Sequence, residues 1–359
     1  MSAGLFDPVS FARGPGMKNR FMLAPLTNQQ SHADGTLSDE EFRWLTMRAQ
    51  GGFGLTMTCA SHVIANGQGF IGQLGCFDDA HLPGLTRLAE AIHSFDSLAI
   101  VQLHHAGRRS PADLIGGAPL SSGDDDKMGA RAMTTEEVEE VIEAFVAAAV
   151  RTEKAGFDGI ELHGAHDYLI CQFLNGELNR RDDRFGGSLE NRSRVLFDVI
   201  DGIRARCGAD FHVGVRLSPE RFGMKTSEIV TVYERLVGEG KVDMIDMSLW
   251  DCFKPGADED FADRRLIDIF ANLERGNVRL AVAGKLYAAA DMQRCIDAGA
   301  DIVAVGRAAI TNHDFPDRTR SDPGFKMREL PVAKATLLEE GLSEAFVGYM
   351  GNWQGFVAD

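Results

Sequence analysis

The sequence predicts an α/β protein whose strands and helices form a single (β/α)8 barrel, the TIM barrel. Short apolar segments alternate with helical segments along the whole chain of 359 residues, which indicates repeated βαβ units and a parallel sheet. There are eight apolar segments, and each is a continuous run, as expected of parallel strands that are covered on both faces. Eight such units over this length are typical of a (β/α)8 barrel, with a doubly wound sheet as the alternative.

The expected strands are short runs rich in β-branched and other apolar residues. They lie at Arg20 to Ala24, Gly54 to Thr58, Leu98 to Leu103, Gly159 to Leu162, His212 to Arg216, Met244 to Met247, Leu280 to Ala283 and Ile302 to Val305. The glycine cluster at 51–54 precedes a strand, so we interpret it as the end of the helix before it. No Gly-x-Gly-x-x-Gly follows any strand, which disfavours a doubly wound dinucleotide-binding sheet.

Helices are expected between the strands, and two of them begin with clear capping signals. Ser38 is a good N-cap for a helix from Asp39 to Gln50, whose first turn is acidic. Thr134 and Glu137 have capping-box spacing and open a helix that runs to about Ala155. Further helices are expected at about Leu189 to Arg206, Thr226 to Glu239, Phe261 to Leu273 and Ala288 to Ala298.

No stretch of the chain has the composition of a linker between domains. We therefore expect one domain over residues 1–359, with a C-terminal extension from about residue 317 that wraps the barrel. Two long loops, 110–133 and 249–260, are expected over the barrel mouth. Trp250 and Phe253 on the second loop either line a pocket or pack against the neighbouring loop. Trp353 either anchors the extension or meets a partner subunit, which leaves a homo-oligomer open.

Composition narrows the class of partner to a small-molecule substrate. The formal net charge of -16 disfavours nucleic acid and anionic membrane surfaces. No apolar run approaches the ~20 residues that cross a bilayer, and the N-terminus lacks the layout of a signal peptide, so a cytoplasmic location is expected. The six cysteines include no Cys-x-x-Cys, which argues against a zinc ribbon, an iron–sulfur cluster or a dense disulfide framework.

The most informative residues follow the fourth expected strand. His163 and His166 come directly after it, and Tyr168 lies two residues further on. In a barrel, the residues just past each strand converge on one face, where active sites lie. Three interpretations of the histidines are open. They bind a metal, for which no third ligand is evident, they donate hydrogen bonds to a substrate oxygen, or they are packed core residues. A tyrosine with a pKa of ~10 stays protonated at neutral pH, so Tyr168 is either a general acid or a core residue.

The ends of four other strands carry groups that suit one ligand. Gln102 donates and accepts hydrogen bonds at once, as the edge of a flavin pyrimidine ring requires. Arg216 would stabilise negative charge on that edge. Gly284, Gly306 and Arg307 follow the seventh and eighth expected strands, where barrels often bind a phosphate group. Each residue alone is a weak signal, but together four strands supply complementary parts of one site.

Five segments of the chain together form a family signature. They are Asn-Arg-Phe-Met-Leu-Ala-Pro-Leu-Thr at 19–27, Gln-Leu-His-His-Ala-Gly-Arg at 102–108, His-Gly-Ala-His-Asp-Tyr-Leu-Ile-Cys-Gln-Phe-Leu at 163–174, Asn-Arg-Arg-Asp-Asp-Arg-Phe-Gly-Gly-Ser-Leu-Glu-Asn-Arg at 179–192 and Val-Gly-Arg at 305–307. In this order they closely resemble the old yellow enzyme family, the FMN-dependent NAD(P)H:flavin oxidoreductases or ene-reductases. The resemblance covers nearly the whole chain.

The resemblance implies a TIM barrel that holds FMN, with NADPH or NADH as electron donor. The residues that it implies for FMN are Ala24, Pro25, Leu26, Thr27, Ala60, Gln102, Arg216, Gly284, Gly306 and Arg307. Thr27 would contact the flavin near N5 and tune its potential. His163 and His166 would bind the activating oxygen of an α,β-unsaturated carbonyl or nitro compound. The C=C bond would then be reduced by hydride transfer from flavin N5 and protonation by Tyr168.

The chain departs from the family pattern at positions that bear on the substrate. The His/His pair resembles one branch of the family, whereas Thr27 resembles the other. Asp167 stands where the family usually has Gly, the segment 28–30 lacks the usual Arg or aromatic residues, and the segment 247–252 lacks the common Ser-Gly pattern. Two alternatives stay open: an FMN-dependent demethylase or amine dehydrogenase on the same scaffold, and a non-catalytic flavin-binding protein.

Overall fold

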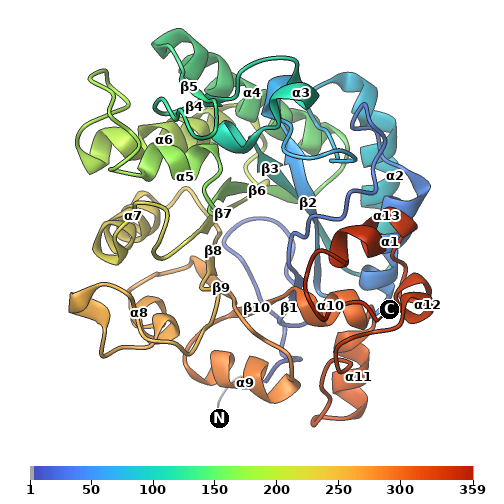
Figure 1. Cartoon of the computed structure of the whole chain (residues 1–359). Coiled ribbons are helices and arrows are strands. Elements are labelled where there is room, and N and C mark those ends of the chain that lie inside the picture. Colours follow the sequence, from blue (N-terminus) through green and yellow to red (C-terminus); the bar gives the residue numbers. More distant parts are fainter. Residues whose placement is uncertain (1–3, 359) are drawn as a thin grey trace.

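The computed structural model describes residues 4–358, and its centre is a closed barrel of eight parallel strands (Figure 1). The predicted (β/α)8 fold is therefore confirmed. In order around the barrel, the strands are β1 (Phe21–Leu23), β10 (Ile302–Val305), β9 (Arg279–Ala283), β8 (Met244–Ser248), β7 (His212–Leu217), β6 (Gly159–Gly164), β3 (Leu98–His104) and β2 (Leu55–His62). All eight predicted strands are present.

The strands are buried on both faces, which is why they are continuous apolar runs. One apolar cluster fills the interior at the end where the strands begin, and Val9 and Met17 of the N-terminal segment join it. A second, larger cluster lies between the sheet and the helices. Because the N-terminal end of the barrel is packed with apolar side chains, the polar residues at the other end are left to form a site.

Helices surround the barrel on its outer side (Figure 1). The longer ones are α1 (Asp39–Gln50), α2 (Leu82–His93), α4 (Thr135–Lys154), α6 (Leu189–Arg206), α7 (Thr226–Glu239) and α9 (Ala289–Asp297). The shorter ones are α3 (Ala112–Ile115), α5 (Leu169–Leu174), α8 (Leu266–Ala271), α10 (Arg307–Thr311), α11 (Phe315–Ser321), α12 (Lys334–Glu339) and α13 (Glu344–Met350). Both predicted caps form: Ser38 accepts from the backbone of Glu41, and Thr134 and Glu137 make a capping box. Within residues 4–358, no helix has the length and apolar character that crossing a bilayer requires.

The helix predicted from Phe261 to Leu273 is present only from Leu266 to Ala271, so its predicted start is wrong. The chain instead makes a short 3-10 turn, η4 (Glu259–Phe261), and α8 begins only at Leu266. Pro255 and Arg265 form an antiparallel bridge, and the amide of Gly256 donates to the carbonyl of Arg264 at 3.1 Å. This pairing needs extended backbone at 264–265, so a continuous helix cannot form there. Helix α2, whose first turn contains a proline, was not predicted.

Short elements shape the loops at the barrel mouth. The loop 110–133 contains the small parallel pair β4 (Leu120–Ser121) and β5 (Arg131–Ala132). Single 3-10 turns, η1 (Ala65–Gly67), η2 (Asp79–His81) and η3 (Gly107–Arg109), follow the ends of β2 and β3. The loop is tied to α5, because the hydroxyl of Ser122 donates to the carbonyl of Gln172 at 2.7 Å.

The C-terminal residues pack against α1 and lie beside α10 (Figure 1). The ring of Phe346 on α13 meets Trp44 on α1 edge to face, with centroids 4.9 Å apart. The amide of Ser343, which caps α13, donates to the side chain of Gln30 at 2.8 Å. The last helices therefore contact the first helix of the barrel and the loop that precedes it.

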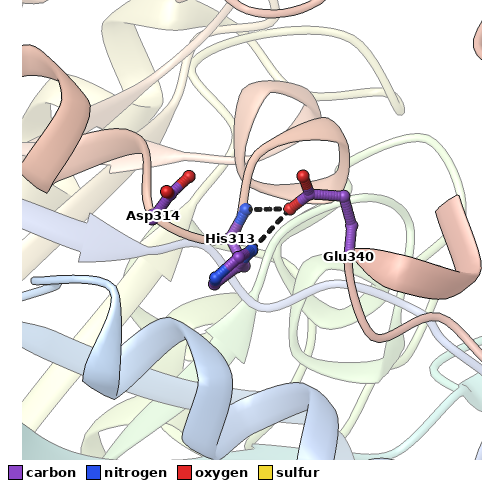
Figure 2. A group of neighbouring side chains, drawn as sticks. All are labelled: His313, Asp314 and Glu340. Carbon is purple, nitrogen blue, oxygen red and sulfur yellow. Dashed lines mark hydrogen bonds and ion pairs between the residues drawn. The ribbon is translucent and has the colours of Figure 1, made fainter. Parts of the chain in front are cut away.

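Glu340 connects these C-terminal helices to the segment after α10 (Figure 2). Its carboxylate is 4% exposed and accepts from the backbone and Nδ1 of His313 at 2.7 and 2.6 Å, and from Arg328 at 2.5 Å. Asp314 lies nearby but accepts from Arg318 at 2.7 Å. Because N–H donors occupy both oxygens of Glu340, we interpret this group as a hydrogen-bonded clamp and not as a metal site. Burial alone would raise the pKa of Glu340, but these hydrogen bonds outweigh it and hold the pKa at about 2.

We expect Glu340→Gln to destabilise the protein by about 2–3 kcal/mol at neutral pH. The NH2 group of Gln is a donor, and it would face an N–H donor that the carboxylate now accepts from. The folded-state pKa of Glu340 is depressed below its ordinary value of 4.5, so its contribution is present above that value and is lost as the pH falls toward about 2. Urea unfolding between about pH 3 and 7 measures this difference. The control is Asp314→Asn, which should change stability by less than about 1 kcal/mol. A pH-independent difference for Glu340→Gln would contradict the argument.

Candidate functional site

The polar residues of the candidate site lie where the strands end, as predicted. The register of the sheet places His163 of β6 opposite Arg216 of β7, and Arg216 opposite Asp246 of β8. On the other side of β6, Glu161 lies opposite Gln102 of β3. Neighbouring strands therefore bring together three of the predicted site residues and two carboxylates that were not predicted.

His163 and His166 form a close pair beside Tyr168. Nε2 of His163 and Nδ1 of His166 are 3.4 Å apart, and the rings of His163 and Tyr168 meet edge to face at 4.8 Å. A further ring, that of the buried His104, lies 4.3 Å from Tyr168. Among residues 4–358, neither histidine of the pair has enough His, Cys, Asp or Glu neighbours to complete a metal site. The metal interpretation of the pair is therefore not supported.

Burial keeps both histidines neutral. It lowers the pKa of His163 well below its usual range, and it lowers the pKa of His166 to about 3. Nδ1 of His163 accepts from the amide of Ala165 at 3.3 Å, so the proton of the neutral ring lies on Nε2. That N–H points toward His166. At neutral pH the pair thus presents one N–H at the gap between the two rings, and it presents a second one when the proton of His166 lies on Nδ1.

Ser248 is a site residue that the sequence analysis missed. Its hydroxyl lies 2.7 Å from Nε2 of His166 and 3.5 Å from Nη2 of Arg216. It is the last residue of β8, directly after a predicted strand. The rule that residues at strand ends converge would have found it.

A buried charge cluster lies between the strands beside the histidines. Nη1 of Arg216 is 3.2 Å from Asp246, and the amide of Gln102 donates to Glu161 at 2.7 Å. Glu161 and Asp246 are fully buried. Burial, and next to it the charge of Asp246, raises the pKa of Glu161 to about 8, and burial also raises the pKa of Asp246. Since one guanidinium balances one carboxylate, Glu161 holds a proton at neutral pH and Asp246 is the counter-ion of Arg216.

One end of the predicted cofactor site offers polar atoms without partners. Nε of Arg216 is buried and has no hydrogen-bond acceptor among residues 4–358. The side-chain oxygen of Gln102 likewise accepts no hydrogen bond there, because only its amide nitrogen is used, by Glu161. Ala60 of β2 lies opposite Gln102 in the sheet. A bound group with an acceptor and a donor on one planar edge would satisfy both side chains, as the pyrimidine edge of a flavin does.

The other end of the predicted cofactor site follows β1, β9 and β10. A pocket there is lined by Pro25, Leu26, Thr27 and Arg307, among others, and Ala24 precedes it at the end of β1. A Cβ on Gly284 would lie 2.9 Å from a backbone nitrogen, so only glycine fits that approach. A Cβ on Gly306 would meet nothing closer than 3.6 Å, which leaves room beside its backbone. Arg307 donates to the hydroxyl of Tyr287 at 2.8 Å and has four further N–H groups for an anion. The residues present therefore fit FMN.

Asp167, which stands where the resembled family usually has Gly, forms an ion pair. Arg108 contacts both of its oxygens, at 2.7 and 3.1 Å, and reaches Asp125 of the loop 110–133 at 2.8 Å. His166 and Asp167 both have left-handed backbone, with φ of 60° and 62°. Arg109 donates to the carbonyl of His166 at 2.8 Å, and its guanidinium lies 5.0 Å from the ring of Tyr168. Two arginines therefore stabilise the turn that presents the histidine pair.

Comparison with known sequences identifies relatives over nearly the whole chain. The profile of the NADH:flavin oxidoreductase / NADH oxidase family matches residues 4–323. A probable NADH-dependent flavin oxidoreductase of Bacillus subtilis is 34% identical over 368 aligned residues, which cover 98% of this chain and 97% of that protein. An NADH:fumarate oxidoreductase of Klebsiella pneumoniae is 33% identical over 88% of this chain. This chain spans only 36% of that longer protein.

Solved structures agree with the sequence matches. An old yellow enzyme homologue from Zymomonas mobilis superposes with a TM-score of 0.80 at 26% sequence identity. The superposition covers 96% of this chain and 99% of that one. The fold therefore has a counterpart in a protein of known structure over nearly the whole chain.

We expect Asp167→Ala to destabilise the protein by about 1–3 kcal/mol, because it removes the partner of Arg108 and keeps a Cβ on left-handed backbone. Asp167→Gly removes the same ion pair but adopts that backbone without strain, so it should cost about 1 kcal/mol less. Chemical denaturation of the two variants and the wild type measures the difference. If the glycine variant were no more stable than the alanine variant, backbone strain at 167 would not be a significant cost.

Proposed function

This chain belongs to the NADH:flavin oxidoreductase / NADH oxidase family, and on that premise we propose that it reduces the C=C bond of α,β-unsaturated carbonyl or nitro compounds. Its cofactor is FMN, and its electron donor is NADH or NADPH. The observation that carries the proposal is the neutral pair of His163 and His166, whose facing nitrogens are 3.4 Å apart beside Tyr168. Such a pair can hold one oxygen atom between two N–H groups.

FMN, when bound, would carry the hydride from the nicotinamide to the acceptor, and the protein would bind and orient both. Gln102 and Arg216 would hold the pyrimidine edge. Gly284, Gly306 and Arg307 would hold the phosphate group, since they follow β9 and β10. The other residues that would contact FMN are Ala24, Pro25, Leu26, Thr27 and Ala60.

The two histidines would bind the oxygen that activates the C=C bond. An oxygen at about 2.9 Å from both nitrogens fits between Nε2 of His163 and Nδ1 of His166. As the β-carbon of the acceptor is reduced, negative charge grows on this oxygen. Donors that are already in place stabilise that charge without reorganisation, which lowers the barrier.

Ser248 would set the tautomer of His166. A neutral histidine that donates from Nδ1 must accept at Nε2. The hydroxyl of Ser248 lies 2.7 Å from Nε2 and can donate to it, while its oxygen faces Nη2 of Arg216 at 3.5 Å. The guanidinium can only donate, so it occupies a lone pair of the hydroxyl oxygen and leaves the hydroxyl proton free to point toward His166. This relay would leave Nδ1–H free for the substrate oxygen.

Tyr168 would supply the proton to the α-carbon. Burial raises the pKa of Tyr168 above its ordinary value, so the phenol is protonated at neutral pH. The guanidinium of Arg109, 5.0 Å from the ring, opposes that shift and would stabilise the phenolate left after the transfer. The tyrosine is thus a general acid held beside the histidine pair.

Tyr168→Phe tests the proposed function. We expect anaerobic reduction of bound flavin by NADH or NADPH to stay within about twofold of the wild type, and reoxidation by an enone to slow by about 10²–10⁴-fold. Stopped-flow absorbance near ~450 nm follows both half-reactions. Equal loss in both would contradict the role of Tyr168. A wild-type protein that binds flavin but is reduced by neither nucleotide would refute the function, and reduction by N-methylated amines instead would favour a demethylase or amine dehydrogenase.

Ser248→Ala and Ser248→Thr test the relay. The alanine variant should lose the Nδ1–H tautomer of His166 and reduce an enone about 10–100-fold more slowly, whereas the threonine variant keeps a hydroxyl and most of the activity. The ¹⁵N chemical shifts of the His166 ring report the tautomer directly. An unchanged tautomer in the alanine variant would show that Ser248 does not set it.

A further inference from the structure

A pocket opens beside His166, between the loop after β7 and the loop after β8. Two groups of side chains line it. His166, Ser218 and Ser248 form a hydrogen-bonded group, since the amide and Nε2 of His166 lie 3.1 and 2.7 Å from the two hydroxyls. Arg221 and Trp250 form the second group, with the guanidinium 5.1 Å from the indole ring. The remaining apolar walls are Pro219, Phe222 and Leu249.

Arg221 is a cation without an anionic partner. Among residues 4–358, its side chain makes no hydrogen bond and no ion pair, and its guanidinium contacts only the rings of Trp250 and Phe222, at 5.1 and 5.8 Å. The neighbouring carboxylate, Glu220, is 3% exposed and is bound by Lys254 and by the amide of Ala257 at 2.6 Å. Glu220 therefore does not neutralise Arg221.

Five other basic residues around the mouth already have partners. Arg108 pairs with Asp125 and Asp167, Lys285 with Asp251, and Arg216 with Asp246, while Arg109 and Arg307 donate to the His166 carbonyl and the Tyr287 hydroxyl. The chain as a whole carries a net charge of -16, so an anion is repelled at long range and needs a local cation to bind. Among the described residues that line the pocket, Arg221 is the one arginine or lysine, and no carboxylate pairs with it.

The backbone of both loops is held in an unfavourable conformation that shapes this pocket. Arg221, Phe222 and Trp250 all have left-handed backbone, with φ of 73°, 55° and 63°. Bulky residues rarely adopt this region, and such strain is concentrated at ligand sites. A bridge between Arg221 and Met224 fixes the first turn. The left-handed turns of both loops place Arg221, Phe222 and Trp250 in one cluster at the wall of the pocket.

We infer that this pocket, the Arg221 pocket, binds an anionic end of the acceptor, so that the preferred acceptors are unsaturated compounds that carry a carboxylate besides the activating group. The inference rests on the proposed function of the same site. The activating oxygen would lie between His163 and His166, the carboxylate would pair with Arg221, and Trp250 would cover the short apolar stretch between them. The ring contacts hold the guanidinium before the substrate arrives, which reduces the entropy lost on binding.

The test compares an acid with its ester. The substrates are (E)-4-oxopent-2-enoate and its methyl ester, and the proteins are wild-type holoenzyme, Arg221→Gln, Arg221→Lys and the control Arg43→Gln, an exposed arginine on α1. We expect Arg221→Gln to raise the KM for the acid about tenfold and to leave the KM for the ester within about twofold. Arg221→Lys should keep most of the affinity for the acid, and Arg43→Gln should match the wild type.

A binding measurement separates this inference from the proposed function. The saturated acid 4-oxopentanoate cannot be reduced, and its affinity for each holoenzyme is measured by calorimetry, with a similar tenfold loss expected for Arg221→Gln. Equal effects on acid and ester, or no effect of Arg221→Gln on either the KM or the affinity, would overturn the inference. If the wild type reduced neither substrate but bound 4-oxopentanoate through Arg221, the proposed function would fail and the inference on the pocket would stand.

Discussion

The buried guanidinium of Arg216 is the group on which the arrangement of the site depends. A charge in the interior must be balanced, and Asp246 balances it at 3.2 Å. A second carboxyl group, Glu161, is buried close to this pair. Burial raises its pKa to about 8, so at neutral pH it is protonated and adds no further negative charge. The same guanidinium faces Ser248 and through it His166. Arg216 therefore takes part both in the charge balance on the cofactor side of the site and in the hydrogen bonds on its substrate side.

The mouth of the barrel is built from turns that most residues avoid. Left-handed backbone occurs at His166 and Asp167 after β6, at Arg221 and Phe222 after β7, and at Trp250 after β8. Each turn costs conformational energy that the surrounding contacts must offset. Ion pairs and hydrogen bonds from Arg108 and Arg109 do so at the first turn, and ring contacts around Arg221 help to fix the others. The strain lies where side chains must point toward a ligand, whereas the strands beneath are regular and apolar.

The fold was predictable from local patterns because parallel strands buried on both faces are continuous apolar runs, and the helices between them begin with capping residues. Helices α1, α6 and α7 have the predicted bounds. One error has a tertiary cause. The pairing of Pro255 with Arg265 prevents a helix from beginning at Phe261. Helix α2 was missed although the proline in its first turn is a usual helix-start signal, and its apolar face packs on the barrel.

By itself, the sequence determined the barrel, the family and the residues that end the strands, because strand order and strand ends follow from chain position alone. Tertiary structure decided which polar groups neutralise one another. Asp167 could not be explained from the sequence, because its partner Arg108 is distant in the chain and meets it only through the converging ends of β3 and β6. For the same reason only the fold showed that Glu220 is bound by Lys254 and that Arg221 is left without a counter-ion. Charge pairing depends on distance in space, which a sequence without its fold does not contain.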